Sequence, residues 1–119
     1  MKTTKTVLRK VCEAIESKKG DEVTILDISK ISSFTDFFVI CHGHNEKQNQ
    51  AICDEIMERL KKEKHGFPVH VEGYQHAEWI LMDYMDFVVH ILSPRSRQSY
   101  QLEKLWGDGI EVKPKALTA

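Results

Sequence analysis

Cysteine is scarce in this 119-residue chain, which contains only Cys12, Cys41 and Cys53. Their number is odd and no CxxC pair occurs, so neither a zinc ribbon nor a thioredoxin-type redox site can be read from the sequence. Each cysteine lies in an apolar run, where it is expected to act as a small core residue. Three core thiols fit the reducing cytoplasm better than a secreted disulfide scaffold.

An excess of either charge is also missing, since 17 basic residues face 18 acidic ones and the net charge is −1 with histidine neutral. A protein that coats DNA or RNA needs a strong basic excess, so that class is excluded, although a local basic patch is not. The balance hides an uneven distribution. Residues 20–93 carry thirteen acidic and six basic side chains, whereas both ends of the chain are basic.

Long apolar runs, linkers and repeats are absent as well. No run approaches the ~18 residues of a membrane span, and the first ten residues, MKTTKTVLRK, contain no apolar signal-peptide core. No Pro/Gly-rich linker or internal repeat divides the chain. We therefore expect one cytoplasmic domain over residues 1–110, with no membrane contact, followed by a mobile tail over residues 111–119.

What is present is an alternation of helical and strand patterns. The four-residue connection at 83–86 predicts an antiparallel hairpin, and the passage from Phe37 to Val71 is long enough for a right-handed parallel crossover. The sequence predicts an α/β fold, a mixed five-stranded sheet covered by helices in the order α-β-β-α-β-β-β-α. The expected helices are 3–19, 46–66 and 94–106, and the expected strands are 23–28, 37–41, 69–71, 79–82 and 87–92.

The glycine turn Gly43-His44-Asn45 is a first candidate for chemistry, because it joins a strand to a helix that Asn45 is suited to cap. Free backbone N–H groups at a helix N-terminus suit a phosphate. The turn matches neither a Walker loop nor GxGxxG, and the adjacent Asp54 and Glu55 do not share a helix face on which to hold magnesium. A plain strand-to-helix turn is favoured, and an active nucleotidyltransferase stays a less favoured hypothesis.

Other polar residues give weak catalytic signals. His42 and His44 share one face of a strand, but no HExxH pattern completes a zinc site. His90 lies inside an apolar strand, where a hydrogen-bonded, half-buried imidazole is favoured. No GxSxG nucleophile occurs. We therefore predict that the protein is not an enzyme and has no catalytic residue, metal or cofactor.

Residues 71–86 mix aromatic side chains with carboxylates, which favours a binding role. Strand alternation places Trp79, Leu81 and Asp83 on one face, and Ile80 and Met82 on the other. Tryptophan and tyrosine are typical binding anchors, and flanking acids favour a basic partner. The alternative, that Trp79 is core and the acids are a solvated rim, stays open at this point.

Four segments in this order resemble the Iojap/RsfS family of ribosomal silencing factors, over roughly residues 6–108. They are 36–40, 71–73, 79–91 and 100–106, of which the longest reads WILMDYMDFVVHI. The resemblance implies a fold similar to that of nucleotidyltransferases. It also implies that the protein binds the large ribosomal subunit through its protein L-fourteen and sterically blocks joining of the small subunit when nutrients are short.

The same resemblance implies further properties of the partner and the site. Ribosomal RNA would be at most a secondary contact, no small-molecule substrate is implied, and family members often form homodimers. A large-subunit assembly factor acting at the same surface is the alternative, because it needs the same contact. The partner-binding residues assigned by motif are Tyr74, Trp79, Leu81, Asp83, Tyr84 and Asp86.

Two departures from the family pattern stand out. Met85 replaces a common glycine at a turn position, which raises the question of a positive φ there. His42 and His44 lie where the family commonly has Ala-Thr-Gly-Asn-Ser, and they leave a local metal or anion function open.

Overall fold

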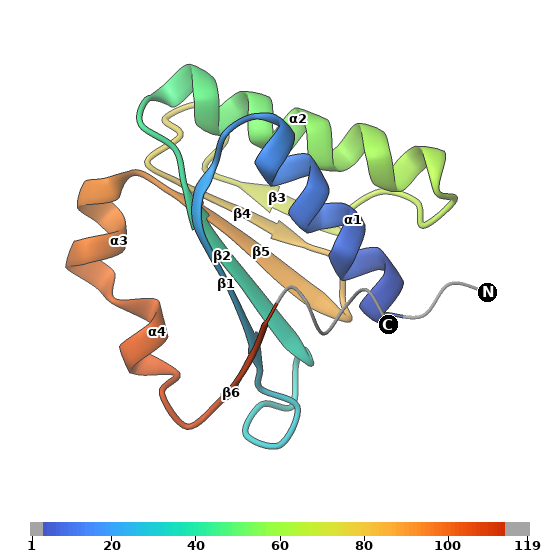
Figure 1. Ribbon diagram of the computed structural model, residues 1–119, viewed down its shortest axis with the longest axis vertical. Helices are drawn as coiled ribbons and strands as arrows, with labels where there is room; N and C mark the ends of the chain where they lie inside the picture. Colours follow the sequence, from blue (N-terminus) through green and yellow to red (C-terminus); the bar gives the residue numbers. More distant parts are fainter. Residues whose placement is uncertain (1–3, 114–119) are drawn as a thin grey trace.

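A six-stranded mixed sheet forms the centre of the computed structural model, which describes residues 4–113 (Figure 1). The strand order is β3-β4-β5-β2-β1-β6; β2 and β5 pair in parallel, and all other neighbours pair antiparallel. The helices are α1 (Thr4–Ser17), α2 (Glu46–Lys62), α3 (Pro94–Tyr100) and α4 (Leu102–Leu105). The strands are β1 (Asp21–Asp27), β2 (Phe37–His42), β3 (His70–Glu72), β4 (Trp79–Asp83), β5 (Phe87–Leu92) and β6 (Ile110–Val112).

The predicted α/β class is confirmed, but the expected count of five strands is wrong. The sixth strand, β6, pairs antiparallel with the edge of β1, from Ile25 opposite Val112 to Asp27 opposite Ile110. Three residues carry too little pattern to signal a strand, so β6 depends on the edge that β1 offers. Strand β6 also includes Glu111 and Val112, the first two residues of the predicted tail. Residues 114–119 of that segment lie outside the described residues.

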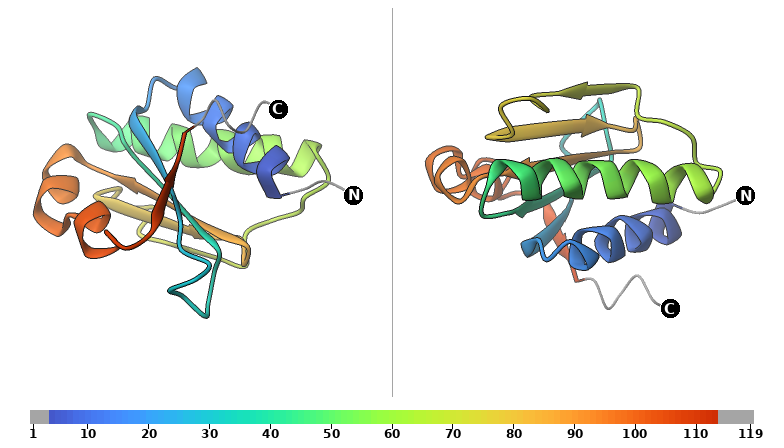
Figure 2. Two further views of the ribbon diagram at one scale, coloured as in Figure 1. Left: turned by 60° about the horizontal axis from the view of Figure 1, so that its bottom comes forward. Right: turned by 90° about the horizontal axis from the view of Figure 1, so that it is seen from above.

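Helices α1 and α2 lie side by side on one face of the sheet (Figures 1 and 2). They bury their apolar stripes against alternate residues of the central strands, among them Ile80 and Met82 of β4. Cys12, Cys41 and Cys53 are buried and unpaired in this layer, as predicted. Burial raises the pKa of each thiol to about 12, so all three stay protonated at neutral pH.

The final helical segment lies on the other face, at one end of the sheet (Figure 2). The sequence predicts one helix from Pro94 to Trp106, and this is wrong, because Gln101 adopts a left-handed conformation (φ 47°) that ends α3 before α4 begins. The break turns Leu102 inward. Trp106 then packs edge-on against Phe38, with ring centroids 5.1 Å apart.

Arg97 ties α3 and α4 to the sheet. Its guanidinium donates to Glu103 Oε2 (2.8 Å) and Thr24 Oγ1 (3.1 Å). It also donates to His42 Nδ1 (3.1 Å), which must accept because a guanidinium has no lone pair. A buried charge requires such a complete set of partners, so Arg97 fixes where the two short helices lie.

The connections follow the predicted chemistry. At the start of α2, Asn45 Oδ1 accepts the Gln48 N–H (2.8 Å), and Gln48 Oε1 accepts the His44 N–H (2.7 Å). The β4–β5 hairpin is antiparallel, as predicted. From the pairings, β3 runs parallel to β2, so α2 does connect two parallel strands, although β4 and β5 lie between them. Within residues 4–113, none of the helices has the length and apolar character needed to cross a membrane.

Met85 in the β4–β5 turn has a φ of 76°, and its side chain is 62% exposed. A left-handed conformation costs an ordinary side chain about 1 kcal/mol, whereas asparagine tolerates it better. We therefore expect Met85→Asn to raise the free energy of unfolding by about 0.5–1 kcal/mol, measured by urea denaturation. Met85→Leu is the matched control and should leave stability unchanged. An asparagine variant no more stable than the leucine variant would contradict this account of the turn.

Candidate partner-binding face

The face of β3 and β4 that points away from α1 and α2 is not covered by a helix among the described residues (Figure 2). A shallow depression of ≈ 320 Å³ lies there, lined by Glu72, Gly73, Trp79 and Leu81. We call Glu72, Trp79, Leu81 and Tyr100 the tryptophan face. Its position follows from the short α3–α4 segment, which packs over β1, β2 and β5 and leaves β4 partly open.

The side chains of β4 alternate as the sequence predicts. Trp79 and Leu81 are half-buried and pack against the core layer under α4, while Ile80 and Met82 are fully buried under α1 and α2. Trp79 is therefore neither a core residue nor a free surface residue. The indole packs on the protein and also lines the depression.

His90 lies on the neighbouring strand, β5, and its buried side chain contacts the Trp79 indole. The indole Nε1 donates to His90 Nδ1 at 3.0 Å, and Leu81 is directly opposite His90 in the β4–β5 register. His90 is only 4% exposed and packs edge-on against Phe38, with ring centroids 4.6 Å apart. This is more burial than the half-buried imidazole predicted from the sequence. Burial lowers the pKa of His90 to about 4, so the ring is neutral at neutral pH.

Tyr100 belongs to the tryptophan face, although it is not among the partner-binding residues predicted from the sequence. It is the last residue of α3 and is 54% exposed, and its ring centroid lies 4.6 Å from that of Trp79. No local pattern joins two residues so far apart in the chain. Only the folding of α3 against the sheet brings the two aromatic rings together.

Gly73 and Glu72 shape the edge of the depression. Gly73 has a φ of 78°, and a Cβ there would collide with the carbonyl oxygen of Trp79, so glycine is required where the chain leaves β3. The Glu72 carboxylate lies 3.2 Å from His70 Nε2. It adds negative charge beside the aromatic pair.

Tyr84 does not lie on this face, which corrects its prediction as an accessible binding residue. It is 5% exposed and stacks on Phe87, with ring centroids 5.0 Å apart. Burial raises the pKa of its hydroxyl. The strand ends at Asp83, and Tyr84 turns into the layer under α2. Strand alternation groups Tyr84 with Ile80 and Met82 on the helix-covered face, as observed, so the wrong placement comes from the assignment by motif.

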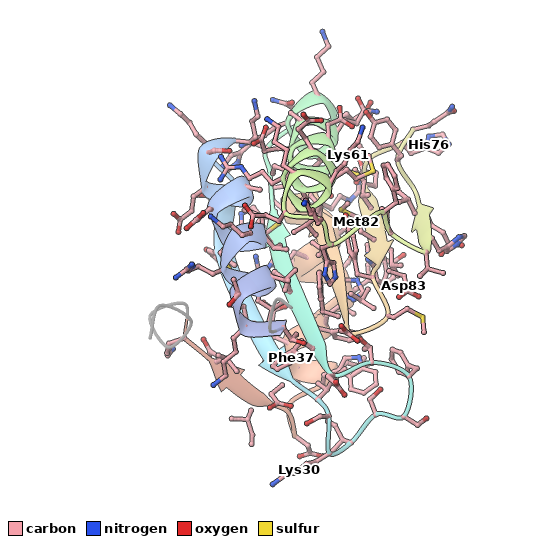
Figure 3. The ribbon with its side chains drawn as sticks, turned by 90° about the vertical axis from the view of Figure 1, so that its right-hand side faces the viewer. Lys30, Phe37, Lys61, His76, Met82 and Asp83 are labelled. Atoms are coloured by element: carbon pink, nitrogen blue, oxygen red, sulfur yellow. The ribbon has the colours of Figure 1, made fainter. Side chains whose placement is uncertain are left out.

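The remaining predicted residues are dispersed. The Tyr74 hydroxyl donates to Asp54 of α2 (2.9 Å), so its side chain is directed toward the helix-covered side. Asp83 Oδ1 accepts the Met85 N–H (2.8 Å) and serves the hairpin turn. Asp83 lies toward the Phe37 end of the sheet, away from His76 (Figure 3). Asp86 is exposed in the same turn. Of the six predicted residues, only Trp79 and Leu81 form the tryptophan face.

The Gly43 turn borders a second depression of ≈ 500 Å³ at the start of α2. Glu46 and Glu78 line it together with Lys47, so the lining has no basic excess that would favour a phosphate. The acids that could hold magnesium are engaged elsewhere, Asp54 with Tyr74 and Glu55 with Arg59 (2.6 Å). The geometry gives no support to nucleotidyl transfer.

The two histidines beside this turn have separate partners. His42 accepts from Arg97, and His44 Nε2 lies 2.6 Å from Asp21 Oδ2. Within the described part of the chain, no group of three or more histidine, cysteine or acidic side chains is placed to hold a metal ion. The arrangement is that of two local polar contacts and not of a shared ligand set.

The fold is that of an α/β domain with a partly exposed aromatic surface, and comparison with known proteins identifies its family. The model of the family described as "Ribosomal silencing factor during starvation" matches residues 1–118. Ribosomal silencing factor RsfS from Halalkalibacterium halodurans is 41% identical over 108 residues, covering 90% of this chain and 91% of that protein. RsfS from Bacillus subtilis is 40% identical over 105 residues and covers 87% of both chains. The chain belongs to the RsfS family.

Structural and distant relatives agree with this assignment. A crystal structure of a Chromobacterium violaceum protein matches with a TM-score of 0.85 at 31% identity, covering 89% of this chain and 88% of that one. A mouse protein named "Mitochondrial assembly of ribosomal large subunit protein 1" is 27% identical over 94 residues. The match covers 77% of this chain and 41% of the mouse protein.

The lowered pKa of His90 makes a prediction about stability and pH. The unfolded imidazole takes up a proton near pH 6.5, whereas the folded ring stays neutral to about pH 4, so folding loses stability as the pH falls through this interval. Between pH 7 and pH 4 this linkage should cost the native protein about 2–3 kcal/mol.

Urea denaturation of the native protein and of His90→Asn at both pH values measures this cost as the difference between their pH dependences. Other titrating groups, such as His42 and Glu55, are common to both proteins and cancel. Equal pH dependence of the two proteins would contradict the buried, neutral state of His90.

Proposed function

We propose that this protein is a cytoplasmic ribosomal silencing factor that binds the large ribosomal subunit through protein L-fourteen. Bound there, it sterically blocks the small subunit and lowers translation when nutrients are limiting. The family membership and the names of the bacterial relatives support the ribosomal role. The paired rings of Trp79 and Tyr100, on a part of the sheet without a covering helix, are the observation that carries the choice of surface.

The chemistry of the face suits a basic protein surface. Large aromatic side chains with one open side are typical anchors at interfaces, and Tyr100 offers its ring at low entropic cost. Glu72 borders the aromatic pair, and Glu78 is exposed next to Trp79 in the chain. The acidic excess of residues 20–93 adds a favourable long-range term for a basic partner. A ribosomal protein fits these properties better than bare RNA.

A large-subunit assembly factor that acts at the same surface is a second candidate, favoured by the name of the mouse relative. The two roles differ in their effect on mature subunits. A silencing factor lowers the yield of joined ribosomes when purified mature subunits are mixed, whereas a factor acting only in assembly leaves that yield unchanged. Light scattering of the subunit mixture measures this difference. Light scattering of the protein alone determines whether it forms the homodimer.

The docking surface can be tested by changing its two exposed rings. We expect Trp79→Ala combined with Tyr100→Ala to weaken binding to purified large subunits by about thirtyfold or more, the size of an interface hot spot. Co-sedimentation at a series of subunit concentrations measures the affinity. Phe67→Ala is the matched control, because Phe67 is 67% exposed and contacts Lys61 of α2, on the helix-covered side.

The control variant should bind as the native protein does, and binding should require protein L-fourteen on the subunit. Native affinity in the double variant would show that the tryptophan face is not the docking surface. Unchanged binding to subunits lacking protein L-fourteen would show that the partner is a different one.

A further inference from the structure

We propose that His90 is a positioning residue for docking. It holds the Trp79 indole in the orientation that meets the partner, and it accepts the hydrogen bond of the indole N–H. The proposal rests on the proposed function of the tryptophan face and adds a buried residue that cannot itself contact the partner. The hydrogen bond from Trp79 Nε1 to His90 Nδ1 (3.0 Å) is the observation that carries it.

The bond determines which atoms of His90 and Trp79 remain available. An indole N–H can only donate, so His90 Nδ1 must carry a lone pair and the neutral ring must hold its proton at Nε2. The Nε2 atom is buried and has no hydrogen-bond partner among the described residues. Leaving one polar atom unsatisfied is costly, and a structure that only needed to fill space here would be served by an apolar side chain.

The two strands that flank β5 both hold His90 in place. Phe38 of β2 packs edge-on against the imidazole (4.6 Å), and the Trp79 indole of β4 donates to it. Trp79 in turn contacts the Tyr100 ring from α3 (4.6 Å). The orientation of both exposed rings therefore depends on a buried acceptor in the central strand of the sheet. A partner contacts the faces and edges of the rings, because the indole N–H already donates to His90.

Two substitutions distinguish the role of His90 as a hydrogen-bond acceptor from its role in filling space. His90→Leu removes the acceptor and keeps an apolar side chain of comparable bulk. His90→Asn places an amide oxygen near the position of Nδ1, so it can again accept from the indole. Both keep the surface of the molecule unchanged, since His90 is buried.

Two measurements on these variants test the proposal. We expect His90→Leu to bind purified large subunits about tenfold more weakly, the effect of losing one hydrogen bond that orders an anchor, and His90→Asn to recover most of that loss. In ¹H–¹⁵N spectra, the Trp79 indole N–H should exchange with solvent about tenfold faster in His90→Leu and stay protected in His90→Asn. Trp106→Phe assigns the two indole signals.

The native protein provides a measurement that does not depend on any variant folding. A long-range ¹H–¹⁵N spectrum should show His90 as the Nε2-protonated tautomer at pH 7, and an Nδ1-protonated ring would overturn the proposal. Native affinity in His90→Leu, while Trp79→Ala weakens binding, would also overturn it and leave the docking face intact. Native affinity in Trp79→Ala would instead remove the proposed docking face on which the positioning role rests.

Discussion

The parallel pairing of β2 with β5 is the constraint on which the rest of the fold depends. All six residues of β5 are buried, and β2 is buried over its central four, so both strands need cover on both faces. Parallel neighbours cannot be joined by a tight turn, and the chain therefore passes through α2, β3 and β4 before β5 forms. This passage places α2 over one face and leaves β4 beside β5.

The two faces are covered unequally. The two longest helices pack on one face, whereas the other is covered by α3 and α4, which Arg97 binds to β1 and β2. These short helices leave β4 partly open. Trp79 is left with one open side, and the end of α3 brings Tyr100 against it. A partly exposed aromatic surface thus arises where the cover of a two-sided core is incomplete.

Within this frame, the polar groups of the open face are used for local geometry. The Trp79 indole is bonded to His90, the Asp83 carboxylate supports the hairpin turn, and Glu72 lies beside His70. The surface that remains is mainly aromatic, with acidic groups at its margin. Such a surface suits a protein partner that offers apolar and basic groups, which agrees with membership of a family of ribosomal silencing factors.

Much of the fold could be predicted from residue patterns because the relevant interactions are local. Alternation in β4 correctly placed Trp79 and Leu81 opposite Ile80 and Met82, and Asn45 with Gln48 marked the start of α2. The errors have separate causes. Tyr84 is assigned to the binding face by the family motif, whereas its alternation with Ile80 and Met82 agrees with its burial, and β6 is too short to show a period. Gln101 breaks a helix that no glycine or proline interrupts.

The sequence by itself determined most of the elements, the buried cysteines and the face of β4 that carries Trp79, since each depends on the spacing of neighbouring residues. Only the tertiary structure decided that β6 joins the sheet, that Tyr100 joins Trp79 and that His90 binds the indole. These contacts join residues from different strands and helices. Their geometry depends on strand order and on where α3 packs, and no local period encodes either.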